Sequence, residues 1–410
     1  MRIFYTFVLH LFALMIEIAS VFNKKARRTR WGQWHTNGIL RNTIDRQAKY
    51  IWFHAASLGE FEQGRPLIET IRKRYPQYKI LLTFFSPSGY EVRKNYDGAD
   101  VVCYLPFDTP FKVNKFLHLA KPAMAIFIKY EFWYNYLAEL RRRNIPTYLV
   151  SGIFRREQLF FTWYGGWYRK ALHCFGRLFV QDEASALLLA EFGIKNVSIC
   201  GDTRFDRVLE VQRQARLLPV VEEFVGAGEQ LVFVAGSSWP EDEDMLLPYF
   251  NEHPEVKMII APHEIHREHL IDIESKLQRP SIRLSETNEQ SVTGKECLII
   301  DSFGQLSSIY RYAHLAYIGG GFRDGIHNIL EAAVYGVPVL FGPNYQKYKE
   351  AVDLIVAGGA FYFVKKEDFR ERMEKMTANP EFLQNAGRIV FDYVQQNSGT
   401  TEKILKELPL

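Results

Sequence analysis

The stretch of residues 318–343, IGGGFRDGIHNILEAAVYGVPVLFGP, constrains the fold of this chain more than any other. An apolar run at residues 315–318 ends in three glycines, a polar loop follows, and residues 329–335 have the pattern of a helix. Glycine and proline end this helical segment before a second apolar run at residues 337–341. A strand, a glycine turn, a helix and a strand in this order form the unit of a parallel sheet.

The glycine turn also has the features of a phosphate site. Glycines let the backbone approach a ligand closely, and a helix N-terminus offers unpaired N–H groups and the positive end of a dipole. Glu331, one turn into the predicted helix, is placed to accept hydrogen bonds from a ribose. An ordinary strand–turn–helix connection capped by Asn328 is the alternative. The order of the parts favours a nucleotide-sugar phosphate site.

Length and charge limit the class of protein. At 410 residues the chain exceeds one typical domain, so we expect two. Its four cysteines are far apart and lack metal or redox spacing, which indicates a reducing compartment. Residues 1–30 hold six basic side chains and one acidic one, which leaves 45 basic and 46 acidic residues in the remainder. A nearly neutral body argues against a nucleic-acid-binding protein.

The N-terminal segment predicts a membrane anchor. Residues 3–22 are mostly apolar, and as a helix they would be about 30 Å long, enough to reach across a bilayer core. A narrow polar stripe contains His10 and Glu17, so a tilted or interfacial helix fits as well as a spanning one. The basic residues at 24–30 should stay cytoplasmic, beside anionic lipid. A cleaved signal peptide and a buried helix of the body are the alternatives.

After residue 31, apolar runs suited to buried strands alternate with helix-like segments. Six runs precede a polar stretch at residues 208–219, which has no strand character, and six follow it. These two series predict two doubly wound α/β domains that face a cleft. We place the first domain at residues 31–212 and the second at residues 213–410. The anchor and its basic flank, residues 1–30, precede them.

Strand-end loops in the first half carry charged candidates, because ligands of such sheets bind beyond the carboxyl ends of strands. Glu60, in the loop after the run at residues 50–53, could take a proton from an attacking hydroxyl. Glu131 lies among aromatic residues after the run at 123–127, and Arg204 could meet a phosphate or carboxylate. Helix-start acids that complement a dipole, and a surface salt bridge for Arg204, are the alternatives.

In the second half, the loops at residues 235–238, 261–264 and 301–305 follow strands and could contact a nucleotide. Residues 242–244 form a D-x-D pattern, which holds a metal in some transferases. Here the pattern follows a proline at a helix start, which favours complementation of the helix dipole. The sequence contains no C-x-x-C pair or Walker lysine loop, and we expect no metal.

Taken together and in order, these loops resemble the 3-deoxy-D-manno-octulosonic acid (Kdo) transferases of lipopolysaccharide and lipid A core biosynthesis. The motifs are ASLGE at residues 56–60, YEFW around Glu131, GDTRFD around Arg204, APH at 261–263, DSFGQL at 301–306 and GGGFRDGIHNILEAA at 319–333. Any one of them is weak, but six in the right order are specific. The resemblance covers nearly the whole chain.

This resemblance implies an inverting, metal-independent glycosyltransferase of family 30, with the GT-B fold of two Rossmann-like domains. The first domain would bind the acceptor, lipid IVA, and the second would bind the donor, CMP-Kdo; no cofactor is implied. The enzyme would work at the cytoplasmic face of the bacterial inner membrane. By position Glu60 is the general base, and Glu131 and Arg204 match charged groups that stabilise the transition state. The residues that match CMP-contacting segments are Pro262, His263, Phe303, Gly304, Gln305, Asn328, Ile329, Leu330 and Glu331.

Three of these positions depart from the usual pattern of the family, and one of them is Gln305, which replaces a usual glutamate. Arg204 stands where lysine is common, and His263 stands where arginine is common, so a fixed charge becomes a titratable one. Two other functions stay open: a nucleotide-sugar epimerase on the same fold, and a membrane-attached sugar-nucleotide-binding protein without turnover. The basic anchor favours the transferase over a soluble epimerase.

Overall fold

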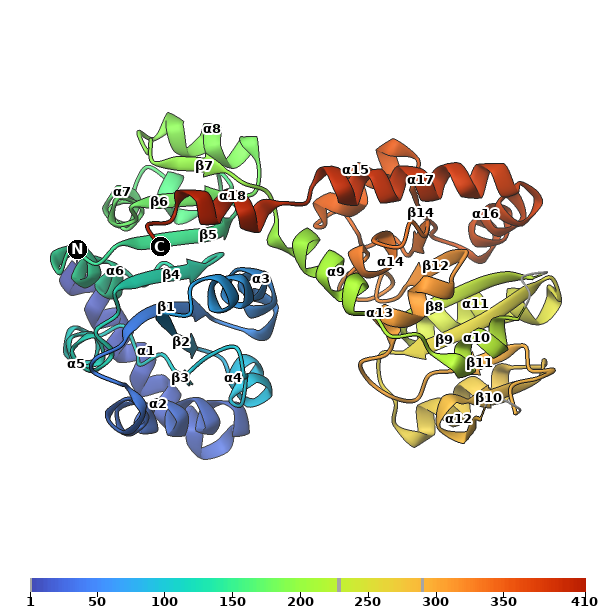
Figure 1. Ribbon diagram of the computed structural model, residues 1–410, viewed down its shortest axis with the longest axis horizontal. Helices are drawn as coiled ribbons and strands as arrows, with labels where there is room; N and C mark the ends of the chain where they lie inside the picture. Colours follow the sequence, from blue (N-terminus) through green and yellow to red (C-terminus); the bar gives the residue numbers. More distant parts are fainter. Residues whose placement is uncertain (1, 227–229, 289–290) are drawn as a thin grey trace. The chain divides into compact units, whose positions relative to one another are not determined.

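The computed structural model describes residues 2–226, 230–288 and 291–410 of the chain. The chain forms two compact units, one of Met1–Arg207 with Ser398–Leu410 and one of Val208–Asn397 (Figure 1). Each unit is built around a parallel sheet with helices on both faces, as the alternation of apolar runs and helical segments predicts.

The first sheet, within the described residues, has seven strands in the order β3-β2-β1-β4-β5-β6-β7, and all of its pairs are parallel. Its strands are β1 (Lys49–Ala55), β2 (Tyr78–Phe84), β3 (Val101–Tyr104), β4 (Met124–Ile128), β5 (Thr147–Gly152), β6 (Arg177–Val180) and β7 (Val197–Ile199). The helices of this unit are α1 (Arg2–Phe22), α2 (Lys24–Thr43), α3 (Leu58–Arg74), α4 (Pro87–Arg93), α5 (Pro110–Ala120), α6 (Tyr134–Arg142), α7 (Gly166–Arg169), α8 (Glu183–Glu191) and α18 (Thr400–Glu407), with 3₁₀ turns at Leu159–Phe161 and Leu172–Cys174. Helix α9 (Thr203–Gln214) runs from the first unit into the second.

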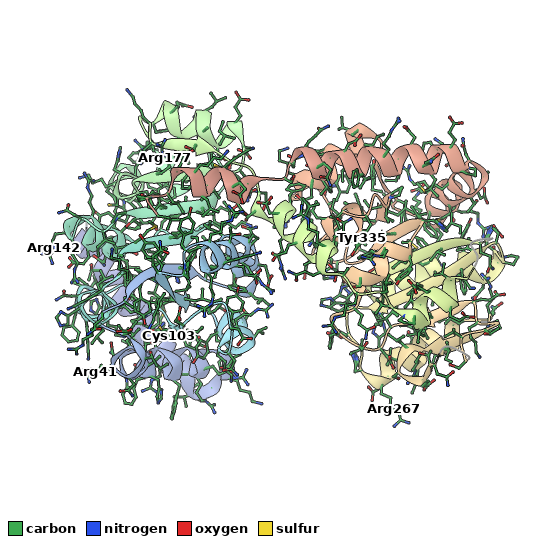
Figure 2. All side chains as sticks on the ribbon, viewed as in Figure 1. Arg41, Cys103, Arg142, Arg177, Arg267 and Tyr335 are labelled. Atoms are coloured by element: carbon green, nitrogen blue, oxygen red, sulfur yellow. The ribbon has the colours of Figure 1, made fainter. Side chains whose placement is uncertain are left out.

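Successive strand residues alternate between two cores, one on each face of the first sheet. On β1, Tyr50 and Trp52 pack into one core, whereas Ile51 and Phe53 pack into the other. Helices α2, α5 and α6 contribute to the first core, which includes the buried Cys103 on β3 (Figure 2). Helix α3 contributes to the second core. Burial on both faces is what a parallel sheet requires, and it explains the continuous apolar runs in the sequence.

Helix α1 packs against the first unit by one face and exposes the other. The Tyr5 hydroxyl donates a hydrogen bond to Asp108 Oδ2 at 2.8 Å, and Asn135 Nδ2 donates to Thr6 Oγ1 at 3.3 Å. Only 6% of the apolar stretch Phe4–Phe22 is buried, so the alternative of a buried core helix does not fit. By length and composition this helix is a candidate membrane span.

The second sheet also has seven parallel strands among the residues described, in the order β10-β11-β9-β8-β12-β13-β14. Its strands are β8 (Leu231–Ser238), β9 (Val256–Pro262), β10 (Ser281–Arg283), β11 (Cys297–Ile299), β12 (Leu315–Ile318), β13 (Val339–Phe341) and β14 (Ala360–Tyr362). The helices are α10 (Pro219–Val225), α11 (Pro240–Glu252), α12 (Arg267–Lys276), α13 (Leu306–Ile309), α14 (Leu330–Ala333), α15 (Lys349–Ala357), α16 (Lys366–Ala378) and α17 (Pro380–Gln396), with 3₁₀ turns at Leu284–Glu286 and Tyr310–Tyr312.

Each of the twelve predicted apolar runs overlaps a strand, but β7 and β10, two of the four edge strands, carry no such run. Both of these strands are three residues long, and their residues are half-buried or exposed. A strand at the edge of a sheet needs less apolar surface than a central one, so the hydrophobic pattern does not mark it.

The C-terminal segment departs from the predicted domain ranges. Residues 213–410 were expected in one domain, yet Ser398–Leu410 belongs to the first unit (Figure 1). Thr400 Oγ1 donates a hydrogen bond to the Cys200 carbonyl at 2.9 Å, and Ile404 is fully buried in the core that contains α3. The predicted junction at residues 208–219 is largely helical, because α9 crosses it. The chain therefore enters the second unit and returns to the first.

We expect Ile404→Ala to lower the free energy of unfolding of the first unit by about 2–5 kcal/mol, because the truncation leaves a cavity in a packed core. Six of the seven tryptophans lie in this unit, so denaturation followed by tryptophan fluorescence reports on it. Lys406→Ala, an exposed change on the same helix, is the control. An equal unfolding midpoint for the two variants would contradict the docking of α18.

Candidate functional site

Glu60 lies in the first turn of α3, directly beyond the carboxyl end of β1. The Ala56 backbone N–H donates a hydrogen bond to Glu60 Oε2 at 2.5 Å, which holds the carboxylate against the strand-end loop. Burial raises the pKa of Glu60 to about 7, and the charge of Glu131 adds to this rise, while the Ala56 N–H opposes it. The mutual repulsion means that the two carboxylates lie in the same region of the first unit.

Glu131 is only 8% exposed and contacts two ring nitrogens. Trp133 Nε1 donates to Glu131 Oε2 at 2.5 Å, and His54 Nε2 lies 2.9 Å from the same oxygen. His54 comes from β1, and Glu131 follows β4, the neighbouring strand in the sheet. Because both strands are parallel, their carboxyl ends meet at one edge and bring these side chains together.

His54 is held at both ring nitrogens. Its Nδ1 lies 3.1 Å from the carbonyl oxygen and 2.9 Å from the hydroxyl of Thr83. Its Nε2 lies 2.9 Å from Glu131 Oε2 and accepts a hydrogen bond from Trp133 Nε1 at 3.1 Å. These contacts fix the orientation of the ring beside the Glu131 carboxylate. The sequence reading assigned no role to His54; a histidine directly after the apolar run of a central strand was the available signal.

Arg204 lies at the start of α9 and pairs with Asp202. Arg204 Nε donates to Asp202 Oδ2 at 2.7 Å, so part of the salt-bridge alternative is correct. Burial raises the pKa of the Tyr130 phenol, and among the nearby charges Glu60 raises it while Arg204 lowers it. Glu60 and Arg204 therefore both lie near enough to Tyr130 to shift its pKa. The structure brings the three predicted catalytic residues into one region of the first unit.

The second unit contains a hollow of about 260 Å³ beyond the carboxyl ends of β8, β9 and β11. Five residues predicted to contact a nucleotide line it. They are Pro262, His263, Phe303, Gly304 and Glu331. The other wall residues are Ser237, Ala261, Ile300, Ser302, Leu306 and Ser307. The Phe303 side chain is 76% exposed, which leaves an aromatic face available at this hollow.

The remaining predicted contact residues do not line the hollow. Ile329 and Leu330 are buried in the unit, and Gln305 caps the short helix α13. Asn328 Nδ2 donates to Glu331 Oε1 at 3.1 Å, so Asn328 holds the carboxylate that does line the hollow. Sequence spacing alone does not separate these supporting residues from the wall residues.

The glycine turn has a packing role in the second unit. A Cβ atom at Gly319 would lie 2.0 Å from the Ser237 carbonyl oxygen, so glycine is required for the close approach of two strand ends. Gly320 has a φ of +90°, and its N–H donates to Asp242 Oδ2 at 3.0 Å. The predicted helix at residues 329–335 is the four-residue turn α14, too short for a strong dipole.

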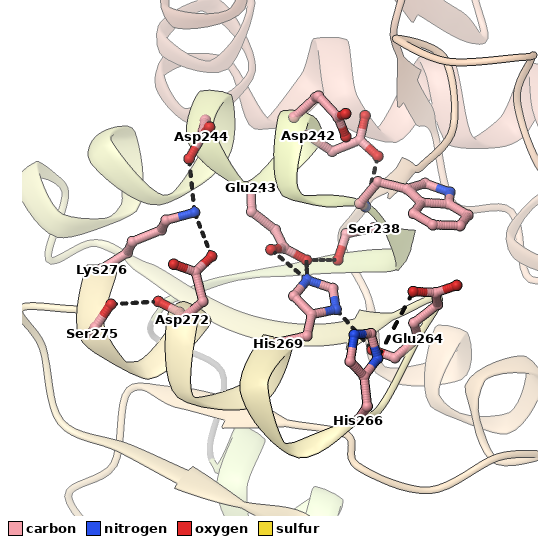
Figure 3. Close-up of polar contacts among 12 residues, drawn as sticks. Ser238, Asp242, Glu243, Asp244, Glu264, His266, His269, Asp272, Ser275 and Lys276 are labelled. Atoms are coloured by element: carbon pink, nitrogen blue, oxygen red, sulfur yellow. Dashed lines mark hydrogen bonds and ion pairs between the residues drawn. The ribbon is translucent and has the colours of Figure 1, made fainter.

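The D-x-D acids have three different environments (Figure 3). Asp242 accepts hydrogen bonds from Trp239 N, Gly320 N and the Tyr317 hydroxyl, which tie α11 to the glycine turn. Glu243 accepts from Ser238 Oγ at 2.8 Å and lies 2.9 Å from His269 Nε2. Asp244 pairs with Lys276.

A stack of rings stands beside the hollow. The rings of Trp239 and His263 are 4.5 Å apart, and those of His263 and His327 are also 4.5 Å apart. The Arg323 guanidinium lies 4.0 Å from the Trp239 ring centroid. Burial and, to a smaller extent, the neighbouring His263 lower the pKa of His327 to about 4, so His327 is neutral at pH 7. The sequence reading did not find Trp239 or His327, because stacking depends on how separate loops meet.

Solved structures that align with both units define the fold as GT-B. The UDP-N-acetylglucosamine 2-epimerase of Neisseria meningitidis aligns with 87% of this chain and 98% of its own, at a TM-score of 0.62 and 15% identity. The glycotransferase of kitacinnamycin aligns with 88% of this chain and 100% of its own, at a TM-score of 0.56 and 13% identity. At these identities the likeness concerns the fold alone.

Sequence comparisons show which known proteins the chain is similar to. Residues 26–207 match the family described as 3-deoxy-D-manno-octulosonic-acid transferase (kdotransferase). The 3-deoxy-D-manno-octulosonic acid transferase of Aquifex aeolicus is 27% identical over 80% of this chain and 85% of its own length. That of Haemophilus influenzae is 24% identical over 98% of this chain and 97% of its own. The chain is thus similar to Kdo transferases over most of its length, in agreement with the six motifs.

We expect Glu131→Gln to lower the pKa of Glu60 below about 7, because the substitution removes the like charge that raises it. The pKa can be measured by following the side-chain carboxyl carbons of ¹³C-labelled glutamate by NMR, with Glu60→Gln used for assignment. Glu62→Gln, on the same helix, is the control and should leave the pKa in place. An unchanged pKa in Glu131→Gln would show that the two carboxylates do not interact.

Proposed function

We propose that this chain transfers Kdo from CMP-Kdo to lipid IVA, with inversion at the transferred carbon and Glu60 as the general base. The observation that carries the proposal is the half-buried carboxylate of Glu60, which lies beyond the end of a central strand and has a pKa of about 7. A base is most effective when its pKa lies near the working pH, because the ionised form is then present and still takes a proton. The two substrates are proposed from the similarity of the chain to Kdo transferases.

Glu131 and Arg204 are proposed to stabilise charge during transfer. Glu131 lies 2.9 Å from His54 Nε2 and accepts a hydrogen bond from Trp133, so its position is restrained. Arg204 is held by Asp202 in the same region and presents a fixed positive charge. Groups restrained in this way can favour a transition state without reorganising when charge develops.

The hollow in the second unit is proposed to bind the CMP part of the donor. The exposed ring of Phe303 offers a face on which a base can stack, and the Glu331 carboxylate can accept hydrogen bonds from ribose hydroxyls. His263 is placed at the same hollow, where a nucleotide phosphate would favour its protonated form. The acids of residues 242–244 contact side chains of the same chain, which supports a reaction without a metal at that sequence.

Helix α1 and its basic flank are proposed to hold the enzyme at the cytoplasmic face of the inner membrane. The outer side of α1 exposes large apolar residues, and six cations lie within residues 1–30. Basic residues next to an apolar helix stay on the cytoplasmic side and attract anionic lipid. This location would bring the chain to a lipid acceptor.

Incubation of the purified chain with CMP-Kdo and lipid IVA tests the proposal. Release of CMP together with a Kdo-bearing lipid, seen by mass spectrometry and unaffected by a chelator, is the expected result. Donor binding without product would leave a sugar-nucleotide-binding protein. An altered sugar nucleotide without transfer would indicate an epimerase, which is the activity of several proteins with the same fold.

We expect Glu60→Gln to reduce the transfer rate about 10²–10⁴-fold, because the amide keeps the shape of the side chain but cannot take a proton. Affinity for CMP should be nearly unchanged, since the hollow lies in the other unit. The wild-type rate should rise as the pH rises through about 7, where Glu60 loses its proton. A Glu60→Gln rate above about a tenth of wild type would be too high for a general base. Glu62→Gln again serves as the control.

We expect Glu331→Ala to weaken CMP binding about tenfold or more, because hydrogen bonds to a charged group contribute about 1.5–3 kcal/mol. Asn328→Ala should weaken binding as well, since Asn328 holds the Glu331 carboxylate. If Asn328 acts only through Glu331, adding Asn328→Ala to Glu331→Ala should change little. Isothermal titration with CMP measures all three, with the exposed Glu268→Ala as the control. Unchanged affinity in both single variants would place the nucleotide elsewhere.

A further inference from the structure

A second hollow, of about 330 Å³, lies in the first unit among α1, α2, α5 and the loop after β3. Three basic side chains line it: Arg30 from α2, and Lys112 and Lys115 from α5. Glu17 from α1 is the one acid among its lining residues, and it pairs with Arg30 at 3.4 Å. The lining therefore carries two positive charges in excess, which favours an anionic occupant.

The floor of this hollow holds a buried hydrogen-bond donor. Gln33 is only 7% exposed, and its Oε1 accepts a hydrogen bond from the Phe107 backbone N–H at 3.2 Å. Its Nε2 has no hydrogen-bond partner among the residues that the structure describes. A buried donor without an acceptor costs about 1–3 kcal/mol, so the arrangement favours an occupant that supplies an acceptor oxygen. A phosphate supplies such oxygens together with negative charge.

Lys112 is held at this hollow in a way that suits an anion. Its ammonium lies 5.0 Å from the Phe107 ring centroid, and burial lowers its pKa, against the influence of Glu17. A partly desolvated ammonium gains more from an anion than an exposed one does, because less water screens the pair. Arg30, whose guanidinium now faces Glu17, can turn its other donors to the same anion.

The rim of the hollow identifies the source of the phosphate. The Trp34 and Phe111 side chains both line it and are 78% and 77% exposed. The outer face of α1 beside them exposes further large apolar residues, among them Phe7, Leu14 and Ile18. Exposed aromatic residues next to an apolar helix are typical of the interface between a membrane and water. A phosphate arriving here is therefore presented by a lipid.

We propose that Arg30, Gln33, Lys112 and Lys115 form a binding site for the phosphate of a membrane lipid head group. Its acyl chains would lie along the exposed face of α1. The site rests on the proposed membrane association of the chain but not on the transfer reaction, since Glu60 and the nucleotide hollow contribute nothing to it. It would set the depth and orientation of the first unit at the bilayer surface.

The test compares binding of the full chain to phosphatidylcholine vesicles with and without phosphatidic acid, in about 1 M salt. At this concentration the Debye length is about 3 Å, so attraction between exposed charges is screened, whereas a partly buried pair is screened much less. Phosphatidic acid should raise the affinity of the wild-type chain for the vesicles. In Lys112→Gln this gain in affinity should be about tenfold smaller, as expected for the loss of one charge-assisted hydrogen bond. Lys112→Arg, which keeps the cation, should retain most of it.

Two further variants separate a built site from diffuse attraction. Gln33→Glu keeps the acceptor for Phe107 but replaces the donor by a negative oxygen, and it should lose affinity as Lys112→Gln does. Lys25→Gln removes one charge from the exposed start of α2 and is the matched control, because all three changes lower the net charge by one. Equal behaviour of the three variants in high salt would overturn the proposal, as would wild-type affinity in Lys112→Gln.

Inorganic phosphate distinguishes a lipid from a soluble ligand. Titration of the chain in detergent with inorganic phosphate should give weak binding, because the apolar contacts with α1 and the rim are missing. Binding of inorganic phosphate as tight as that of phosphatidic acid, with the same dependence on Lys112, would overturn the lipid assignment. Failure to bind vesicles of either composition would overturn both the site and the membrane association, and would leave the transfer assay in detergent unaffected.

Discussion

Burial of both faces of each sheet is the constraint on which the rest of the structure depends. On the central strand β1, alternate residues enter two different cores, so almost every position is apolar and polar chemistry is confined to the strand ends. Because all strand pairs are parallel, these ends gather along one edge. Glu60 and Glu131 meet there, beyond neighbouring strands, and their partial burial together with their mutual repulsion raises the pKa of Glu60.

In both units a histidine lies between a backbone carbonyl and a buried carboxylate. His54 places one nitrogen at the Thr83 carbonyl and the other at Glu131, and His269 does the same with the Glu264 carbonyl and Glu243. In each pair a carbonyl and a carboxylate hold the two ring nitrogens, which fixes the orientation of the ring beside the carboxylate. One pair restrains a candidate catalytic acid, whereas the other lies in the second unit, where Ser238 Oγ also donates to Glu243 (Figure 3).

Sequence reasoning succeeded where a local pattern carries the information. The twelve apolar runs became strands, and the motif residues Pro262, His263 and Glu331 line one hollow although they come from separate loops. It was less successful where one residue type fits two purposes. The triple glycine could serve a ligand, a close contact between backbones, or both, and the role in packing becomes visible only in the approach of Gly319 to Ser237.

The sequence by itself determined the parallel-sheet class, the charged strand-end residues, the apolar and basic N-terminal segment and the similarity to Kdo transferases, because each depends on residue type and local order. The tertiary structure alone decided the partners of those residues. Only folding brings α18 back to the first unit, places His54 beside Glu131, and collects Arg30, Gln33 and Lys112 around one hollow. These contacts join residues far apart in the chain, and their energies depend on burial and distance, which residue order does not specify.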